Sequence, residues 1–258
     1  MSDRFPITHV KVAGTFIATS SRAELVEAAV HDASIPDAPA RIVFDANGHG
    51  IALAQTDASF AAALEQADLV HADGGFLVAI SKRLAAKAIS ERSPTTDMIH
   101  DFAQDENAKH LKHFLLGATE QVNERATAIL RETYPALQIV GRRNGYFAAN
   151  EEEAIITQIN ASGADIVWVG LGKPLEQAFC LRHRDRLKAA WVITAGGCFN
   201  YITGDYPRAP QWMQDNHLEW LHRMVTRPRQ LGWRYLTTNP IALYKALTQT
   251  DRSISVRT

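Results

Sequence analysis

The sequence predicts an α/β protein with a mostly parallel sheet and helices on both faces. Short apolar runs alternate with helix-period segments along most of the chain, which is typical of repeated strand-helix-strand units. The clearest run, residues 165–169, is apolar almost throughout, as a strand covered on both faces requires. Three or four such strands lead into glycine-bearing turns, and in an open α/β sheet that edge is where ligands bind.

The composition limits the class of protein. With 258 residues, of which 46% are hydrophobic and 21% charged, the chain can bury a large core, and we expect one principal domain. The formal net charge of -1 argues against a nucleic-acid partner. Cys180 and Cys198 match neither a redox pair nor a zinc site, which favours a reducing cytoplasm. The sequence contains no recognisable signal peptide or spanning segment, so we expect a protein that is soluble or attached to a membrane surface.

The first half of the chain supplies the first strands and helices. Ser21 and Glu24 form a capping box that begins a helix, and two prolines separate that helix from a strand at 41–44. An alanine-rich helix follows at 57–67, and then a brief strand at 69–71. An Asp-Gly-Gly turn connects this strand to the next helix. The pattern therefore predicts a strand-turn-helix junction at this turn.

The second half repeats the pattern. We expect a strand at 114–116, a helix at 120–133 and a strand at 137–140. Asn150 is expected to cap a further helix, whose first turn carries three glutamates, as the helix dipole favours. A last strand at 191–194 leads into another glycine turn.

The residue pattern of the sequence changes near Pro207. Strands that end in glycine stop there, and tryptophan and arginine become frequent in a helical pattern. We therefore expect a core at 1–206 and a helical, Arg/Trp-rich appendage at 207–258. Tryptophan beside arginine suits an anionic membrane surface or a lipid diphosphate. Packing of the appendage on its own domain explains the pattern equally well.

Asp73 is the most suggestive single residue. A carboxylate in a tight turn at a strand end faces the ligand edge and could act as a general base, but Asp-Gly is also ordinary turn chemistry, which the local sequence favours. Glycines end two later strands, at Gly170, Gly172, Gly196 and Gly197. They either let backbone amides approach a diphosphate or only satisfy strand-to-helix geometry. The local sequence favours neither interpretation over the other.

Several histidines are candidate ligands. His110 and His113 have a helical spacing, but they lie among lysines just before a strand, so we expect a solvated basic turn and no metal site. His49 and His71 lie near the expected cleft, where each could contact phosphate. A structural role is the stronger expectation for both.

Seven motifs occur in a fixed order between about Ile42 and Tyr235. They read ADLVHADG (67–74), YP (134–135), GYF (145–147), GADIVWVGLG (163–172), TG (203–204), RAP (208–210) and LEWLHR (218–223). Together they resemble the WecG/TagA/CpsF family of glycosyltransferases. The resemblance implies a Rossmann-like core whose appendage helps to form the active site.

The resemblance also implies an activity. It is the transfer of a sugar with inversion, from a UDP donor to a polyprenyl-diphosphate-linked acceptor, for cell-surface polymers or exopolysaccharide. No cofactor is expected, and the lack of an Asp-x-Asp pair agrees with metal independence. The expected donors are UDP-ManNAc, UDP-ManNAcA, UDP-GlcNAc and UDP-glucose. The expected location is the inner face of the cytoplasmic membrane, and self-association is a further expectation.

Residue roles follow from the same resemblance. Asp73 takes the position of the base, and Arg223 that of an arginine near the departing diphosphate. The donor-binding positions are Asn47, Gly74, Gly117, Gly170, Gly172, Glu176, Gly196, Asn200 and Arg208.

Four positions depart from the family pattern. Asp45 replaces a threonine, Glu176 lies in a segment whose amide and carboxylate are exchanged, Asn200 replaces an aspartate, and Gln230 replaces an arginine. A noncatalytic nucleotide-sugar-binding or scaffolding subunit is therefore one alternative. A nicotinamide-dependent oxidoreductase is another, although its glycine fingerprint and acidic ribose partner are missing.

Overall fold

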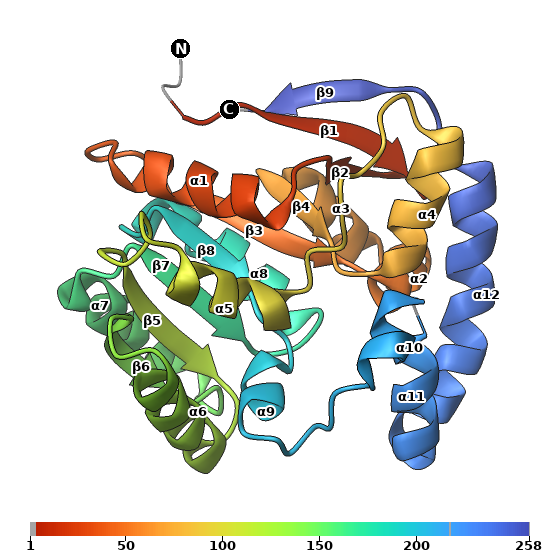
Figure 1. Ribbon diagram of the computed structural model, residues 1–258. Helices are drawn as coiled ribbons and strands as arrows, with labels where there is room; N and C mark the ends of the chain where they lie inside the picture. The colour runs from red at the N-terminus through yellow and green to blue at the C-terminus, as the bar shows by residue number, and fades with distance from the viewer. Residues whose placement is uncertain (1–3, 217, 258) are drawn as a thin grey trace.

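The computed structural model describes residues 4–216 and 218–257 (Figure 1). The strands are β1 (Ile7–Val12), β2 (Thr15–Ala18), β3 (Arg41–Ala46), β4 (Leu69–Ala72), β5 (Lys112–Gly117), β6 (Gln138–Arg143), β7 (Ile166–Gly170), β8 (Trp191–Thr194) and β9 (Ile254–Arg257). The α-helices are α1 (Arg22–Ala33), α2 (Gly48–Thr56), α3 (Ala58–Gln66), α4 (Gly75–Leu84), α5 (Thr95–Gln104), α6 (Glu120–Thr133), α7 (Glu152–Ser162), α8 (Leu175–Arg182), α9 (Cys198–Ile202), α10 (Gln211–Asp215), α11 (Glu219–Thr226) and α12 (Trp233–Thr248). Two short 3-10 turns, η1 (Ala149–Glu151) and η2 (Arg184–Arg186), and one π-helical turn, η3 (Pro228–Gly232), complete the described elements.

The centre of the fold is a parallel sheet. Within the described residues it has six strands in the order β4-β3-β8-β7-β5-β6, and each neighbouring pair is parallel. Parallel neighbours need long crossover connections, which the intervening helices provide. Every strand that the sequence predicts lies in this sheet, so the α/β class is confirmed.

Both faces of the sheet are buried. Along β3, Ile42 and Phe44 belong to one hydrophobic core and Val43 to the other. Helices α1, α5, α6 and α9 contribute to the core that contains Val43, whereas α2, α3, α7 and α8 contribute to the opposite one. The alternation explains why the central strands read as continuous apolar runs.

A second, antiparallel sheet was not predicted. Within the described chain, β1 pairs with β2 on one side and with β9 on the other. The segment after Pro207 is helical through α12 but ends in a strand, because β9 returns to lie along β1 (Figure 1). Helix α12 packs against α2 and α4. Across residues 4–216 and 218–257, no helix is long and apolar enough to cross a bilayer.

Local predictions about helix starts have mixed outcomes. The capping box of Ser21 and Glu24 is present, and α6 has the predicted bounds. The prediction that Asn150 caps a helix is wrong, because Asn150 lies inside η1. The Glu151 carboxylate reaches back to the backbone N–H of Ala148 at 2.8 Å, so the helical turn begins earlier.

The prediction of a solvated basic turn is wrong for His113. This side chain points inward from β5 and is buried, and its Nδ1 accepts a hydrogen bond from the indole of Trp168 at 3.1 Å. Burial lowers the pKa of His113 to about 3. Of these two histidines, His110 is the exposed one, and it lies in the turn before β5.

Candidate active site

A cavity of about 560 Å³ lies at the carboxyl ends of four adjacent strands of the parallel sheet. Residues that follow β3, β4, β7 and β8 line one part of it, and residues of α11 and α12 line another. Open α/β folds bind ligands at this edge of the sheet. The cavity is therefore the candidate active site.

Asp73 lies directly after β4 and lines the cavity. The backbone N–H groups of Asp73 and Gly74 donate to the carbonyl of Ala46 at 2.9 and 3.0 Å, which ties the end of β4 to the end of β3. The side-chain amide of Asn47 donates to Asp73 Oδ2 at 3.0 Å. Asn47 is also the N-cap of α2, where its Oδ1 accepts from Gly50 at 3.0 Å. The amide that holds Asp73 is thus itself fixed by the backbone.

Asp45 and Lys173 form an ion pair beside these residues. Lys173 Nζ lies 2.5 and 2.6 Å from the two carboxylate oxygens, and the side chains are only 8% (Asp45) and 9% (Lys173) exposed. Burial alone would raise the pKa of Asp45 and lower that of Lys173. Their mutual attraction outweighs burial, so the pKa of Asp45 is lowered and that of Lys173 is raised. Both groups therefore carry charge at neutral pH.

Lys173 was missed in the sequence. A basic residue between a glycine and a proline, directly after a buried strand, was a usable signal for it. Asp45 was noted only as a departure from the family pattern. Neither observation alone predicts the pair, because 128 positions separate the two residues in the chain.

Glu176 is hydrogen-bonded to two of the backbone amides that the sequence suggests as diphosphate ligands. Its buried Oε2 accepts hydrogen bonds from the backbone N–H groups of Gly172 at 2.9 Å and Gly196 at 3.0 Å. Burial raises the pKa of Glu176 to about 7, although Lys173 and the two N–H groups act to lower it. In this structure the two amides are bonded to a side chain of the protein, and the glycines line the cavity without presenting them.

Arg223 extends from α11 to the same cavity as Asp73. Its guanidinium donates to Glu219 at 2.8 Å and lies 4.9 Å from the centre of the Tyr201 ring. Nε is buried and has no hydrogen-bond partner among the described residues. Burial acts to lower the pKa of Arg223, but Tyr201, Glu219 and Asp73 act to raise it, and the net shift is upward. The Asp73 carboxylate is therefore close enough to stabilise the charge of Arg223.

Two further arginines line the cavity. Arg92 comes from the loop between α4 and α5, and Arg234 from the first turn of α12. The buried Nε of Arg234 also has no hydrogen-bond partner in the described part of the chain. In the sequence, Arg234 is only one of several arginines of the predicted appendage, and no motif indicates Arg92. With Arg223, these side chains offer N–H donors to an anion such as a diphosphate.

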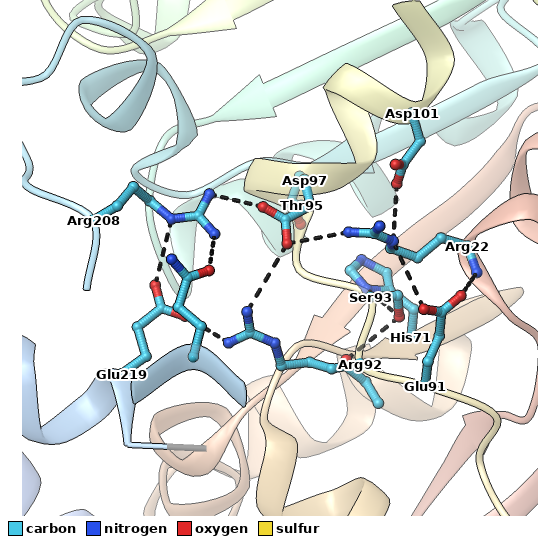
Figure 2. Close-up of polar contacts among 12 residues, drawn as sticks. Arg22, His71, Glu91, Arg92, Ser93, Thr95, Asp97, Asp101, Arg208 and Glu219 are labelled. Carbon is cyan, nitrogen blue, oxygen red and sulfur yellow. Dashed lines mark hydrogen bonds and ion pairs between the residues drawn. The ribbon is translucent and has the colours of Figure 1, made fainter. Parts of the chain in front are cut away.

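A network of ion pairs joins the appendage to the core (Figure 2). Glu219 accepts from Arg92 at 2.5 Å, and Asp97 on α5 lies 2.7 Å from Arg208 and 3.2 Å from Arg22 on α1. Burial acts to raise the pKa of Glu219, but the arginines outweigh it and lower the pKa to about 2. Arg208, a predicted donor-binding residue, is committed to this network and is not among the residues that line the cavity.

The other predicted donor residues divide between cavity and packing. Asn47 and Gly74 line the cavity, whereas Gly117, Gly170 and Asn200 do not. Gly117 has a φ of +142°, and a Cβ there would lie 2.3 Å from the carbonyl oxygen of Gly170. These two glycines permit the close contact of β5 with β7, so packing explains them.

Two observations complete the geometry. Among residues 4–216 and 218–257, no group of three or more His, Cys, Asp or Glu side chains is arranged to hold a metal ion. Gln230, a departure from the family pattern, lies in η3, and its side chain is outside what the structure describes.

Comparisons with known proteins lead to one family of glycosyltransferases. The sequence model of the "Glycosyl transferase WecG/TagA/CpsF family" matches residues 10–255. A Staphylococcus aureus protein (strain MRSA252) named N-acetylglucosaminyldiphosphoundecaprenol N-acetyl-beta-D-mannosaminyltransferase is 27% identical over 203 residues, which cover 79% of this chain and 78% of that protein. A Bacillus spizizenii protein of the same name is 29% identical over 181 residues, which cover 70% of this chain and 68% of that protein. The family match includes both the core and the appendage.

Proposed function

Because the chain belongs to the WecG/TagA/CpsF family of glycosyltransferases, we propose that it moves a sugar from a UDP-sugar to a polyprenyl-diphosphate-linked N-acetylglucosamine. The transfer inverts the anomeric carbon and needs no metal ion. The names of the Staphylococcus aureus and Bacillus spizizenii relatives support this acceptor, and they make N-acetylmannosamine the first sugar to test. UDP-ManNAcA, UDP-GlcNAc and UDP-glucose are the other donors in the proposal.

The observation that carries the proposal is that Asp73 and Arg223 line one cavity although they come from opposite parts of the chain. Asp73 takes the proton of the acceptor hydroxyl, whose oxygen then bonds to the anomeric carbon. The bond from that carbon to the β-phosphate oxygen breaks in the same step, and UDP leaves with the electron pair. A single displacement of this kind inverts the carbon.

Arginines that line the cavity can stabilise the negative charge on departing UDP. Arg223, Arg92 and Arg234 can each donate N–H groups to phosphate oxygens. Of the acidic groups that line the cavity, Asp45 and Asp73 lie at strand ends and Glu176 lies in the first turn of α8, whereas Glu219 on α11 is paired with Arg92 and Arg223. This division supports binding of the diphosphate next to the appendage, with the arginines supplying the charge that a metal would otherwise supply.

The appendage also presents an apolar surface. Large apolar side chains are exposed on α11 and α12, namely Trp220, Val225, Trp233, Leu236, Ile241, Leu243, Tyr244 and Leu247. A lipid-borne acceptor must reach the cavity from a bilayer, so we place this surface against anionic lipid at the inner face of the cytoplasmic membrane. The protein is then cytoplasmic and peripheral, with a core (1–206) and an appendage (207–258) that share one active site. Self-association stays a prediction.

The alternative is a noncatalytic nucleotide-sugar-binding or scaffolding subunit. It is motivated by Asp45 and Glu176, two departures from the family pattern that both line the cavity. Either residue could change which sugar fits, or whether any sugar is transferred.

The test incubates the purified chain with a synthetic polyprenyl-diphosphate-linked N-acetylglucosamine and each of the four donors, with and without EDTA. We expect transfer from at least one donor, at the same rate in EDTA, and a product whose new linkage has the inverted configuration by NMR. Binding of donors by calorimetry without any product would contradict the proposal and support the noncatalytic alternative.

A further inference from the structure

One amide group holds two carboxylates in the candidate active site. Asn47 Nδ2 donates to Asp45 Oδ2 at 2.9 Å and to Asp73 Oδ2 at 3.0 Å, so both oxygens contact the same nitrogen. Two carboxylates this close repel each other. Such repulsion favours protonation of one carboxylate, and a positive charge beside them opposes it.

Lys173 supplies that charge to Asp45. Its ammonium contacts both oxygens of the Asp45 carboxylate, at 2.5 and 2.6 Å, and its stem packs over Gly50 beside the Asn47 cap. In this chain an acid at position 45 comes together with a lysine that neutralises it.

The other groups that face Asp73 come from several elements. His71 precedes it on β4, and burial lowers the pKa of His71, which therefore stays neutral near pH 7. Arg223 faces it from α11, and Tyr201 from α9, where burial raises the pKa of the phenol to about 12. Cys198 also faces it from α9, where burial raises the pKa of the thiol to about 12. Arg223 and Lys173 are two positive charges that interact with Asp73.

We propose that the ion pair of Lys173 with Asp45 positions Asp73. Lys173 offsets the negative charge of Asp45, so that Asn47 can hold the Asp73 carboxylate close to it. The consequence for sugar transfer rests on the proposed function, in which Asp73 is the base. The effect on the protonation of Asp73 does not depend on that function.

The test titrates the aspartate side-chain carboxyl carbons by NMR in the full-length protein without substrate, with Asp73 assigned by an Asp73→Asn variant. In Lys173→Met, the Asp45 and Asp73 carboxyls should titrate as a coupled pair, with the upper midpoint about 1 pH unit or more above either midpoint in the parent. In Asp45→Asn, which keeps an oxygen to accept from Asn47, the unpaired lysine should lower the Asp73 midpoint. The double variant should return Asp73 to within about 0.5 unit of the parent.

The proposal predicts that the Asp73 midpoint rises in Lys173→Met and falls in Asp45→Asn. A general loosening of the site would shift the midpoint in the same direction in both variants. Midpoints that stay at the parent values, or that move in the same direction in both single variants, would overturn the proposal. If Lys173→Met does not fold, the downward shift in Asp45→Asn decides alone. Lys109→Met, at a half-buried lysine remote from the cavity, is the control and should leave the Asp73 midpoint in place.

The pH dependence of transfer separates this inference from the proposed function. The acid limb of kcat should move to higher pH in Lys173→Met and to lower pH in Asp45→Asn. A parent chain that transfers no sugar would refute the proposed function, and the NMR titration would still decide the role of the pair.

Discussion

Replacing Glu219 by glutamine removes one negative charge from between two arginines and keeps the shape of the side chain. Glu219 is 5% exposed, and its carboxylate oxygens lie 2.5 Å from Arg92 of the core and 2.8 Å from Arg223 of its own helix. The carboxylate therefore ties α11 to the core beside the cavity. We expect Glu219→Gln to lower the free energy of unfolding.

The size of the effect follows from the titration of the carboxyl group. Burial acts to raise the pKa of Glu219, but Arg223 and Arg92 lower it to about 2 from an ordinary 4.5. At about 1.4 kcal/mol per unit of pKa, the ionised form contributes on the order of 3 kcal/mol to stability. Because the pKa is lower in the folded state, this contribution is complete above about pH 4.5 and is lost as the pH falls toward 2.

Urea unfolding followed by circular dichroism at pH 7 and pH 3.5 measures this contribution. We expect Glu219→Gln to be about 3 kcal/mol less stable than the parent at pH 7, with a smaller gap at pH 3.5. The matched control is Glu106→Gln, which removes an exposed partner of Lys109 and should change stability by less than about 1 kcal/mol. Equal stabilities of Glu219→Gln and the parent at pH 7, or the same gap at both pH values, would show that the ionised carboxylate does not stabilise the fold.

Three further predictions concern the cavity, the sheet and the appendage. Arg223→Met should lower kcat/KM about 100-fold in the transfer assay. The control Arg227→Met, at an arginine that is not among the cavity-lining residues, should change kcat/KM by less than about 3-fold. Similar losses in both variants would contradict the role of Arg223. Gly117→Ala puts a methyl group 2.3 Å from a backbone oxygen and should cost about 3 kcal/mol or more in urea unfolding, against about 1 kcal/mol for Gly163→Ala, where nothing lies within 4 Å. Trp233→Ser removes a side chain that is 77% exposed on α12 and should weaken cosedimentation with anionic vesicles about 10-fold, and unchanged binding would count against the membrane surface.

The central sheet was predictable because both of its faces are buried. A strand such as β7 is apolar at every position, so its signal does not depend on register. The antiparallel strands gave no such signal. In β9 the exposed positions include Ile254 and Val256, and the strand exists only because it pairs with β1, which lies at the other end of the chain.

The site was predictable where a residue follows a strand directly, as Asp73 does. The roles of glycines were harder to predict, because Gly117 serves packing and Gly172 donates to Glu176, and both look alike in sequence. The ion pair of Asp45 with Lys173 is a tertiary contact between distant positions. Charge compensation of this kind becomes visible only when the strand ends are brought together.

Binding and transfer by Asp73→Asn, measured under the same conditions, test the role of Asp73 directly. The amide keeps the size of the carboxylate but cannot take a proton at neutral pH. We predict that the variant binds UDP-sugar within about 3-fold of the parent affinity while kcat falls about 100-fold or more. A variant that transfers sugar at the parent rate would contradict the assignment of Asp73 as the base.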